Sequence, residues 1–132
     1  MVSKTRSIRI AERIREELAD LLLRSVEDPR LSGITITGVE VDRELAFATV
    51  YVSAVEGSQR SADILAGLNH AQGFLRSELA HRIELRAFPR LRFRWDNTAE
   101  RADHIERLFA SLHSPEASEE DSGGKNGEDE GG

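Results

Sequence analysis

The chain of 132 residues contains no cysteine, which excludes disulfide bonds and metal sites built on thiolates. Its longest aliphatic run is three leucines at residues 21–23, far short of the roughly 20 apolar residues that a membrane-spanning helix needs. Residues 1–7 lack the apolar core of a secretory signal peptide. We therefore expect a cytoplasmic protein that has no contact with a membrane.

Motifs of common enzymes are also absent. The chain has neither the Gly-x-Ser-x-Gly turn of serine hydrolases nor the Gly-x-x-x-x-Gly-Lys loop that binds nucleotide phosphates. Its four histidines form no closed pattern of metal ligands, and Glu78 with His81 is better explained as a surface pair on a helix. We expect no catalysis, no metal, no cofactor and no small-molecule substrate.

Charge is unevenly distributed along the chain. Residues 1–113 hold 17 Lys and Arg against 17 Asp and Glu, whereas residues 114–132 hold one Lys against seven acids. The formal net charge of -6 therefore belongs to the C-terminal segment. Since that segment has no aromatic or branched apolar residue, it cannot offset the entropy lost on ordering, and we predict a disordered acidic tail. The tail has two possible roles: it either keeps the protein soluble or competes with nucleic acid for a basic surface.

The first 113 residues are enough for one domain. Apolar residues recur at helical spacing from about Ser7 to Val26, and the following Asp28-Pro29 ends that helix. A strand comes next, in which the apolar positions change parity at Gly38, and this change predicts a β-bulge. After a corner, residues 45–54 form a second strand that pairs with the first as an antiparallel hairpin.

A long helical run then extends to about residue 85. Gly67 and Gly73 interrupt it, and we expect at least one of them to mark a bend. A third strand follows Pro89, and Asn97 with Glu100 resembles a capping box that opens a last helix through residue 112. The order predicts an α+β domain, in which a three-stranded sheet is covered by helices on one face.

The third strand carries the clearest functional signal. Arginines and apolar residues alternate along it, so they point to opposite faces. The two faces consist of Leu91, Phe93 and Trp95 on one side and of Arg90, Arg92 and Arg94 on the other. Arginines two apart on a strand lie about 6.5–7 Å from each other, close to the phosphate spacing of an extended nucleic-acid strand. The alternative is a solvated edge that carries charge for solubility.

Several short segments occur in a fixed order along the chain. They are Asp28-Pro29-Arg30-Leu31, Gly38-Val39-Glu40-Val41, Val50-Tyr51-Val52-Ser53, Ala71-Gln72-Gly73-Phe74-Leu75-Arg76 and Asp96-Asn97-Thr98. In this order they resemble the ribosome-binding factor A family of bacteria, over residues 8–108. The resemblance implies a type II KH-like fold with the order helix, strand, strand, helix, kinked helix, strand and short C-terminal helix.

KH domains contact phosphates through a Gly-x-x-Gly loop between two helices, and this chain has no such loop. The family carries an Ala-x-Gly kink instead, which Ala71-Gln72-Gly73 matches, and the resemblance places the bend at Gly73. Contact with RNA must then rely more on side chains. The chain departs from the family at the corner between the first two strands, residues 42–45, and at Thr98, where the family usually has serine.

The resemblance implies ribosome assembly rather than catalysis. Members of the family bind the free 30S small subunit late in maturation, near the 5′ end of 16S rRNA. They support 16S rRNA processing and growth in the cold, and they leave before translation. One alternative is a stand-alone KH-like regulator that binds single-stranded RNA, and another is a module that binds only proteins. We expect the ribosome-assembly factor to be a monomer.

Arginines are the expected RNA contacts, because they neutralise phosphates with little reading of sequence. The first set is Arg76, Arg82, Arg86, Arg90, Arg92 and Arg94, and a second patch at the N-terminus is Lys4, Arg6 and Arg9. Phe47 and Tyr51 share one face of the second strand, where they either stack on bases or pack within the domain. His70 and Gln72 flank the kink and either touch a base or sugar or face solvent.

Overall fold

The computed structural model describes residues 1–113, and the predicted acidic tail lies outside these residues. The first helix, α1 (Lys4–Arg24), begins three residues before the position that the apolar periodicity indicated. The reason is a cap, since the Ser3 hydroxyl accepts a hydrogen bond from the backbone N–H of Arg6 at 3.1 Å. The buried stripe of α1 is Ile10, Ile14, Leu18 and Leu21, as the periodicity predicted.

The strands β1 (Ile34–Val41) and β2 (Phe47–Ala54) pair antiparallel, as predicted. Ile36 lies opposite Val52 and Gly38 opposite Tyr51, so Thr37 is the extra residue of a β-bulge. The predicted bulge is therefore confirmed, one residue before the glycine that signalled it.

The corner between these strands is two residues longer than the sequence indicated, because it extends from Asp42 to Ala46. Leu45 has a φ of 58°, a left-handed conformation that is unfavourable for a residue with a side chain. The Asp42 carboxylate compensates by accepting hydrogen bonds from the backbone N–H groups of Ala46 and Phe47, at 2.9 and 2.8 Å. β2 consequently starts at Phe47 rather than at residue 45.

The long helical run is two helices, α2 (Ser61–His70) and α3 (Gln72–Arg82), with the interruption at Ala71. Ala71 has φ -86° and ψ 0°, outside the helical region. The predicted bend is thus present, but its centre is Ala71 and not Gly73, which lies within α3. The run also ends at Arg82, before the predicted residue 85, because Ile83 is extended.

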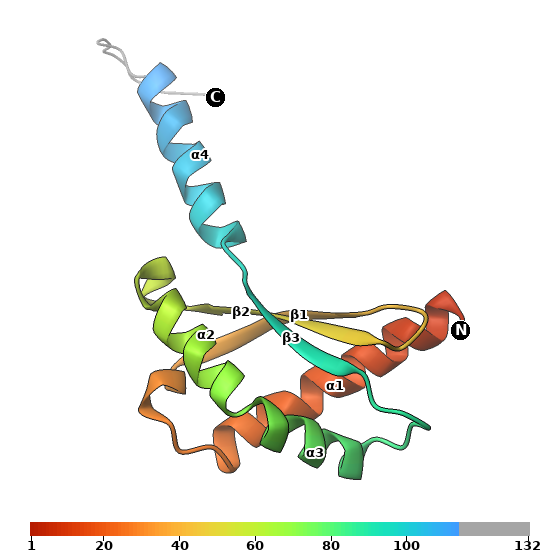
Figure 1. Ribbon diagram of the computed structural model, residues 1–132. Helices are drawn as coiled ribbons and strands as arrows, with labels where there is room; N and C mark the ends of the chain where they lie inside the picture. Colours follow the sequence, from red (N-terminus) through yellow and green to blue (C-terminus); the bar gives the residue numbers. More distant parts are fainter. Residues whose placement is uncertain (114–132) are drawn as a thin grey trace. The chain divides into compact units, whose positions relative to one another are not determined.

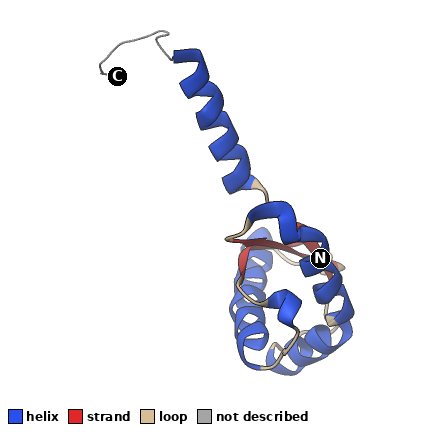
Figure 2. Cartoon of the chain, turned by 90° about the vertical axis from the view of Figure 1, so that its left-hand side faces the viewer, coloured by secondary structure: helices blue, strands red, loops and turns tan. Residues whose placement is uncertain are grey.

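The third strand, β3 (Arg90–Trp95), pairs parallel with β2, which gives the sheet order β1-β2-β3. Two short 3₁₀ helices, η1 (Pro29–Leu31) and η2 (Gly57–Arg60), complete the connections. Figures 1 and 2 show α1, α2 and α3 on one side of this sheet. The α+β fold with helices on one face is therefore confirmed.

The core lies between the sheet and the three helices. Ala48, Val50 and Val52 of β2 alternate with less buried residues and face the helices together with Leu91 and Phe93 of β3. The helices contribute fully buried aliphatic side chains to the same cluster, namely Ile14, Leu18, Leu21, Ile64, Leu68, Leu75 and Leu79. The other face of the sheet carries the intervening polar and aromatic side chains.

A second compact unit begins at Thr98, and the first unit is Met1–Asn97. The helix α4 (Thr98–His113) belongs to the second unit and confirms the predicted C-terminal helix. Ile105, Leu108 and Leu112 are half or more exposed on it, spaced three and four residues apart.

Packing explains why residue 67 is glycine, but it does not explain the glycine at position 73. A methyl group at Gly67 would lie 3.0 Å from Leu31 Cδ2 and 3.3 Å from Asp28 Oδ2, whereas one at Gly73 would meet nothing within 4 Å. Leu31 is buried, and the Asp28 carboxylate is held by Arg30, so neither neighbour can easily give way. Close approach between α2 and η1 therefore requires glycine at position 67.

We predict that Gly67→Ala lowers the free energy of unfolding, because overpacking costs about 1–3 kcal/mol and outweighs the roughly 1 kcal/mol gained in helix propensity. Gly73→Ala is the matched control and should raise stability by up to about 1 kcal/mol. Urea unfolding of both variants measures the difference. Equal stability of the two would show that α2 does not need its close contact with η1.

Candidate nucleic-acid interface

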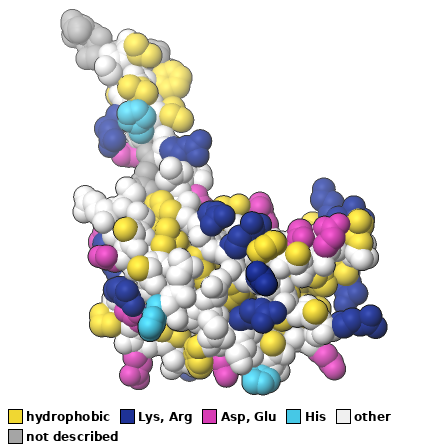
Figure 3. Space-filling model, viewed as in Figure 1, with side chains coloured by type: hydrophobic (Ala, Val, Ile, Leu, Met, Phe, Trp, Pro, Cys, Tyr) yellow, Lys and Arg dark blue, Asp and Glu magenta, His cyan; other side chains and the backbone are white. Residues whose placement is uncertain are grey.

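The arginines of β3 form a row on the open face of the sheet. Leu91 and Phe93 are buried, whereas Arg90, Arg92 and Arg94 are exposed, so the predicted alternation holds. Figure 3 shows basic side chains gathered over the part of the molecule that Figure 1 labels β3. We call Arg90, Arg92 and Arg94 the arginine row.

The arginine row keeps its charge unneutralised. Within residues 1–113, none of its three side chains forms an ion pair with a carboxylate. Arg92 lies over the ring of Phe47, 4.0 Å from its centroid, in a cation–π contact. Arg94 Nη1 donates a weak hydrogen bond to the carbonyl of Phe93 at 3.3 Å. Such guanidinium groups can still donate hydrogen bonds to phosphate oxygens.

A groove of about 570 Å³ runs beside the start of this row. Residues from α3, β2 and β3 line it: Phe47, Gln72, Gly73, Arg76, Arg90 and Leu91. The groove therefore joins the Ala-x-Gly kink to the first arginine of the row, although the two are far apart in sequence. Gly73 leaves room in it, since among residues 1–113 no atom other than those of its chain neighbours and its own helix backbone lies within 4 Å of where a Cβ would be.

Two side chains of α3 hold the start of β3 in place. Arg76 donates from Nη2 to the Phe88 carbonyl at 2.6 Å and from Nε to the Pro89 carbonyl at 3.2 Å. Gln72 Nε2 donates to the carbonyl of Leu91. Arg76 thus has a structural contact that the sequence did not indicate, and its contact with RNA stays a prediction. His70 is exposed at the end of α2.

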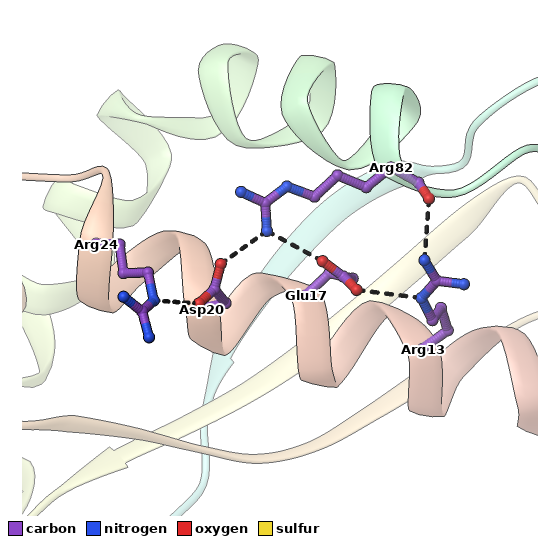
Figure 4. A network of polar contacts seen from close by, with 5 residues as sticks. All are labelled: Arg13, Glu17, Asp20, Arg24 and Arg82. Carbon is purple, nitrogen blue, oxygen red and sulfur yellow. Dashed lines mark hydrogen bonds and ion pairs between the residues drawn. The ribbon is translucent and has the colours of Figure 1, made fainter.

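Arg82 lies in a different environment, between α1 and α3 (Figure 4). Its Nη1 donates to Glu17 Oε1 at 3.0 Å and to Asp20 Oδ2 at 2.9 Å. Arg13 bonds both Glu17 and the carbonyl of Arg82, and Arg24 bonds Asp20. We call these five residues the helix clasp. A phosphate would have to compete with two carboxylates for Arg82, whose role in RNA binding stays a prediction.

The clasp shifts the titration of its acids. Hydrogen bonds from Arg82 and Arg13 lower the pKa of Glu17, and hydrogen bonds from Arg82 and Arg24 lower the pKa of Asp20. The same two carboxylates raise the pKa of the Arg82 guanidinium, so it stays charged. All members of the clasp are partly accessible to water, which weakens each pair.

The remaining predicted contacts lie near the Arg90 end of the row. Arg86 is exposed in the segment between α3 and β3. The second patch, Lys4, Arg6 and Arg9, is exposed on the first turns of α1. Hydrogen bonds between Val2 and Arg43 tie this N-terminus to the β1–β2 corner, and the Arg90 N–H bonds the Ala46 carbonyl at the same end of the sheet.

Acidic groups on the open face are a feature that the sequence did not indicate. Glu40 of β1 accepts a hydrogen bond from the Tyr51 hydroxyl at 3.2 Å, and Thr37 donates to Asp96 Oδ2 at 2.6 Å. Both contacts depend on the bulge at Thr37, which decides the face to which each later residue of β1 points. The change of parity at Gly38 turns Glu40 away from the core, but its contact with Tyr51 and that of Thr37 with Asp96 join different strands and depend on the fold.

Within the described part of the chain, no three His, Asp or Glu side chains are grouped so that they could hold a metal ion. Nor is any described helix both long enough and apolar enough to cross a membrane. The candidate site consists of arginines, aromatic rings and a groove beside the start of α3.

Comparison with known proteins identifies the family. The profile described as Ribosome-binding factor A matches residues 6–109. The chain belongs to the ribosome-binding factor A family. A relative of that name from Syntrophobacter fumaroxidans is 45% identical over 115 residues, which cover 84% of this chain and 97% of the relative. Members of the family are non-catalytic assembly factors, so this chain is not an enzyme.

Solved structures of the family share the fold. The crystal structure of ribosome-binding factor A from Thermus thermophilus has a TM-score of 0.60 at 28% identity, covering 67% of this chain and 93% of that one. A homology model of the Thermus thermophilus factor, fitted into a cryo-EM map of its complex with the 30S subunit, has a TM-score of 0.58 at 28% identity. It covers 70% of this chain and 97% of that one.

We predict that Arg82→Gln lowers the temperature of unfolding in a pH-dependent way. The lowered pKa values of Glu17 and Asp20 mean that the clasp stabilises the fold fully above the ordinary carboxyl pKa values, about 3.9 for Asp and 4.3 for Glu. This stabilisation is lost as the pH falls through the lower values of the folded state. The variant should therefore differ from the wild type at pH 7 and approach it near pH 3.

Arg92→Gln is the matched control, because it removes an exposed arginine that has no ion pair within residues 1–113. Its unfolding temperature should not acquire the same pH dependence. Calorimetric scans of the three proteins from pH 3 to pH 7 provide the test. A difference between Arg82→Gln and the wild type that stayed constant over this range would contradict the assignment of Arg82 to the clasp.

Proposed function

We propose that this protein is a maturation factor that binds the free 30S small ribosomal subunit through the arginine row and the adjoining groove. The observation that carries the proposal is the set of three exposed arginines on β3, none of which is neutralised by a carboxylate within residues 1–113. The complex of the Thermus thermophilus relative with the 30S subunit supports the same partner.

The geometry suits the backbone of folded rRNA. Alternate residues of a strand repeat every 6.5–7 Å or so, which allows successive arginines to meet successive phosphates. The groove beside Gly73 lets the RNA backbone approach the first turn of α3. Gln72 and Arg76 keep the start of β3 in place. Contacts of this kind fix position rather than read sequence.

The details of the proposed role follow the family resemblance. The protein binds late in maturation near the 5′ end of 16S rRNA, supports processing of that RNA and growth in the cold, and leaves before translation. It acts as a monomer in the cytoplasm, where ribosomes are assembled. Lys4, Arg6 and Arg9 form a second contact at the same end of the sheet as Arg90, and Arg86 extends the row.

A stand-alone regulator that binds single-stranded RNA is the second candidate. The aromatic rings of Phe47 and Tyr51 favour it, because they lie on the same open face as the arginine row. Such a regulator should bind naked RNA as well as it binds subunits, whereas a maturation factor should select free 30S subunits.

We predict that replacing Arg90, Arg92 and Arg94 together by alanine weakens binding to free 30S subunits and makes it less dependent on salt. Each lost phosphate contact should reduce the slope of log K against log salt by about 0.9, so three contacts predict a change of about 2–3. Co-sedimentation with free 30S subunits, joined ribosomes and naked 16S rRNA at several salt concentrations measures both quantities.

The control replaces Arg15, Arg24 and Arg107 by alanine, which changes the net charge equally. Each of these arginines pairs with a carboxylate on its own helix. This control should retain the salt slope of the wild type. An unchanged slope in the arginine-row variant would exclude the row as the phosphate contact, and equal capture by naked rRNA would favour the regulator.

A further inference from the structure

The open face of the sheet changes in character from one edge to the other. The strand register places Arg92, Thr49 and Glu40 in one row across the sheet, and Arg94, Tyr51 and Gly38 in the next. The face is therefore basic on β3, aromatic on β2 and acidic at Glu40 on β1. A carboxylate beside the rings would repel phosphates, so phosphate binding alone does not explain Glu40 at this position.

The two rings on β2 are held in defined positions. Arg92 lies 4.0 Å from the centroid of Phe47, and the Tyr51 hydroxyl donates to Glu40 Oε1 at 3.2 Å. Burial and the neighbouring Glu40 carboxylate both raise the pKa of Tyr51, so its hydroxyl keeps the proton that it donates. Rings and guanidinium planes of this kind stack on unpaired bases.

Glu40 adds a hydrogen-bond acceptor beside these rings. One of its oxygens takes the Tyr51 hydroxyl, and the second oxygen keeps its own acceptor sites. An ionised carboxylate accepts hydrogen bonds only, so it selects bases that present an amino group. Adenine, cytosine and guanine each carry one, whereas uracil has carbonyl oxygens on both sides of its single N–H.

The spacing across the sheet fits one nucleotide. β1 and β3 are separated by two strand spacings, about 9–10 Å, which is comparable to the reach of a nucleotide from its phosphate to the edge of its base. A phosphate on Arg92 would therefore bring a base over β2 and its edge towards Glu40. Only an unpaired base can lie flat on the rings in this way.

We propose that the open face of the sheet binds a single-stranded segment of RNA, with phosphates on the arginine row, a base on Phe47 or Tyr51, and its amino group on Glu40. The proposal rests on the proposed function, because the same arginines contact the RNA backbone. It adds a preference for bases with an amino group over uracil.

The test uses the full chain and fluorescein-labelled RNA octamers of adenine, cytosine or uracil, measured by fluorescence anisotropy at one moderate salt concentration. We expect the wild type to bind the adenine and cytosine octamers roughly ten- to a hundredfold more tightly than the uracil octamer, the effect of about one hydrogen bond to a charged group. Glu40→Gln should bring this ratio close to one, since the amide also offers a donor to the uracil carbonyls.

Two further variants act as controls. Tyr51→Ala tests the contribution of stacking, and Glu16→Gln tests the loss of a negative charge elsewhere on the protein. Tyr51→Ala should weaken binding of all three octamers by about fivefold or more through lost stacking. Glu16→Gln removes an exposed carboxylate from α1, on the helical side of the sheet, and should leave the ratio unchanged. Thermal unfolding of each variant verifies that the domain is folded.

The outcomes distinguish this proposal from the proposed function. Base reading on the sheet would be overturned if the wild type bound the three octamers equally, preferred uracil or bound no octamer. It would also be overturned if Glu40→Gln raised the affinity for all three octamers equally. Loss of 30S binding in the arginine-row variant would still support the maturation factor. Conversely, a base preference that depends on Glu40, together with unchanged 30S binding of the arginine-row variant, would support the sheet platform and reject the row as the subunit contact.

Discussion

The parallel pairing of β3 with β2 is the interaction on which the functional face depends. Backbone hydrogen bonds mark its two ends, from Arg90 to Ala46 and from Asp96 to Val52. Since side chains alternate along a strand, a slip of one residue would bury the arginines and expose Leu91 and Phe93. Burial of these two side chains against the helices therefore also fixes the direction of the arginine row.

Contacts at both ends of β3 reinforce this register. Gln72 and Arg76 hold its start by bonding carbonyls of Phe88, Pro89 and Leu91. Near its other end, Thr37 of the β1 bulge reaches Asp96 across the sheet. The kink that lines the groove and the bulge that shapes β1 are thus also the elements that position β3.

Arginine serves two purposes in this fold, and position alone separates them. Arg82 joins α1 to α3 between two carboxylates, and Arg76 bonds backbone carbonyls. Arginines of the row meet an aromatic ring, a carbonyl or solvent, and so retain charge for a ligand. The basic surface therefore consists of the few arginines that form no ion pair within the fold, even though residues 1–113 carry equal numbers of positive and negative residues, 17 of each.

Local periodicity was enough to establish the element order, the bulge, the hairpin and the outward direction of Arg90, Arg92 and Arg94, because each of these follows from the spacing of apolar residues. The sequence predicted a bend in the helical run, but its position at Ala71 rather than Gly73 emerged only in the folded chain, since the pairing of two helices with one sheet lies outside local preference. The same holds for Arg82, which faces Glu17 and Asp20 more than 60 residues away, and for Glu40 beside Tyr51. Contacts between distant segments depend on packing, which periodicity cannot express.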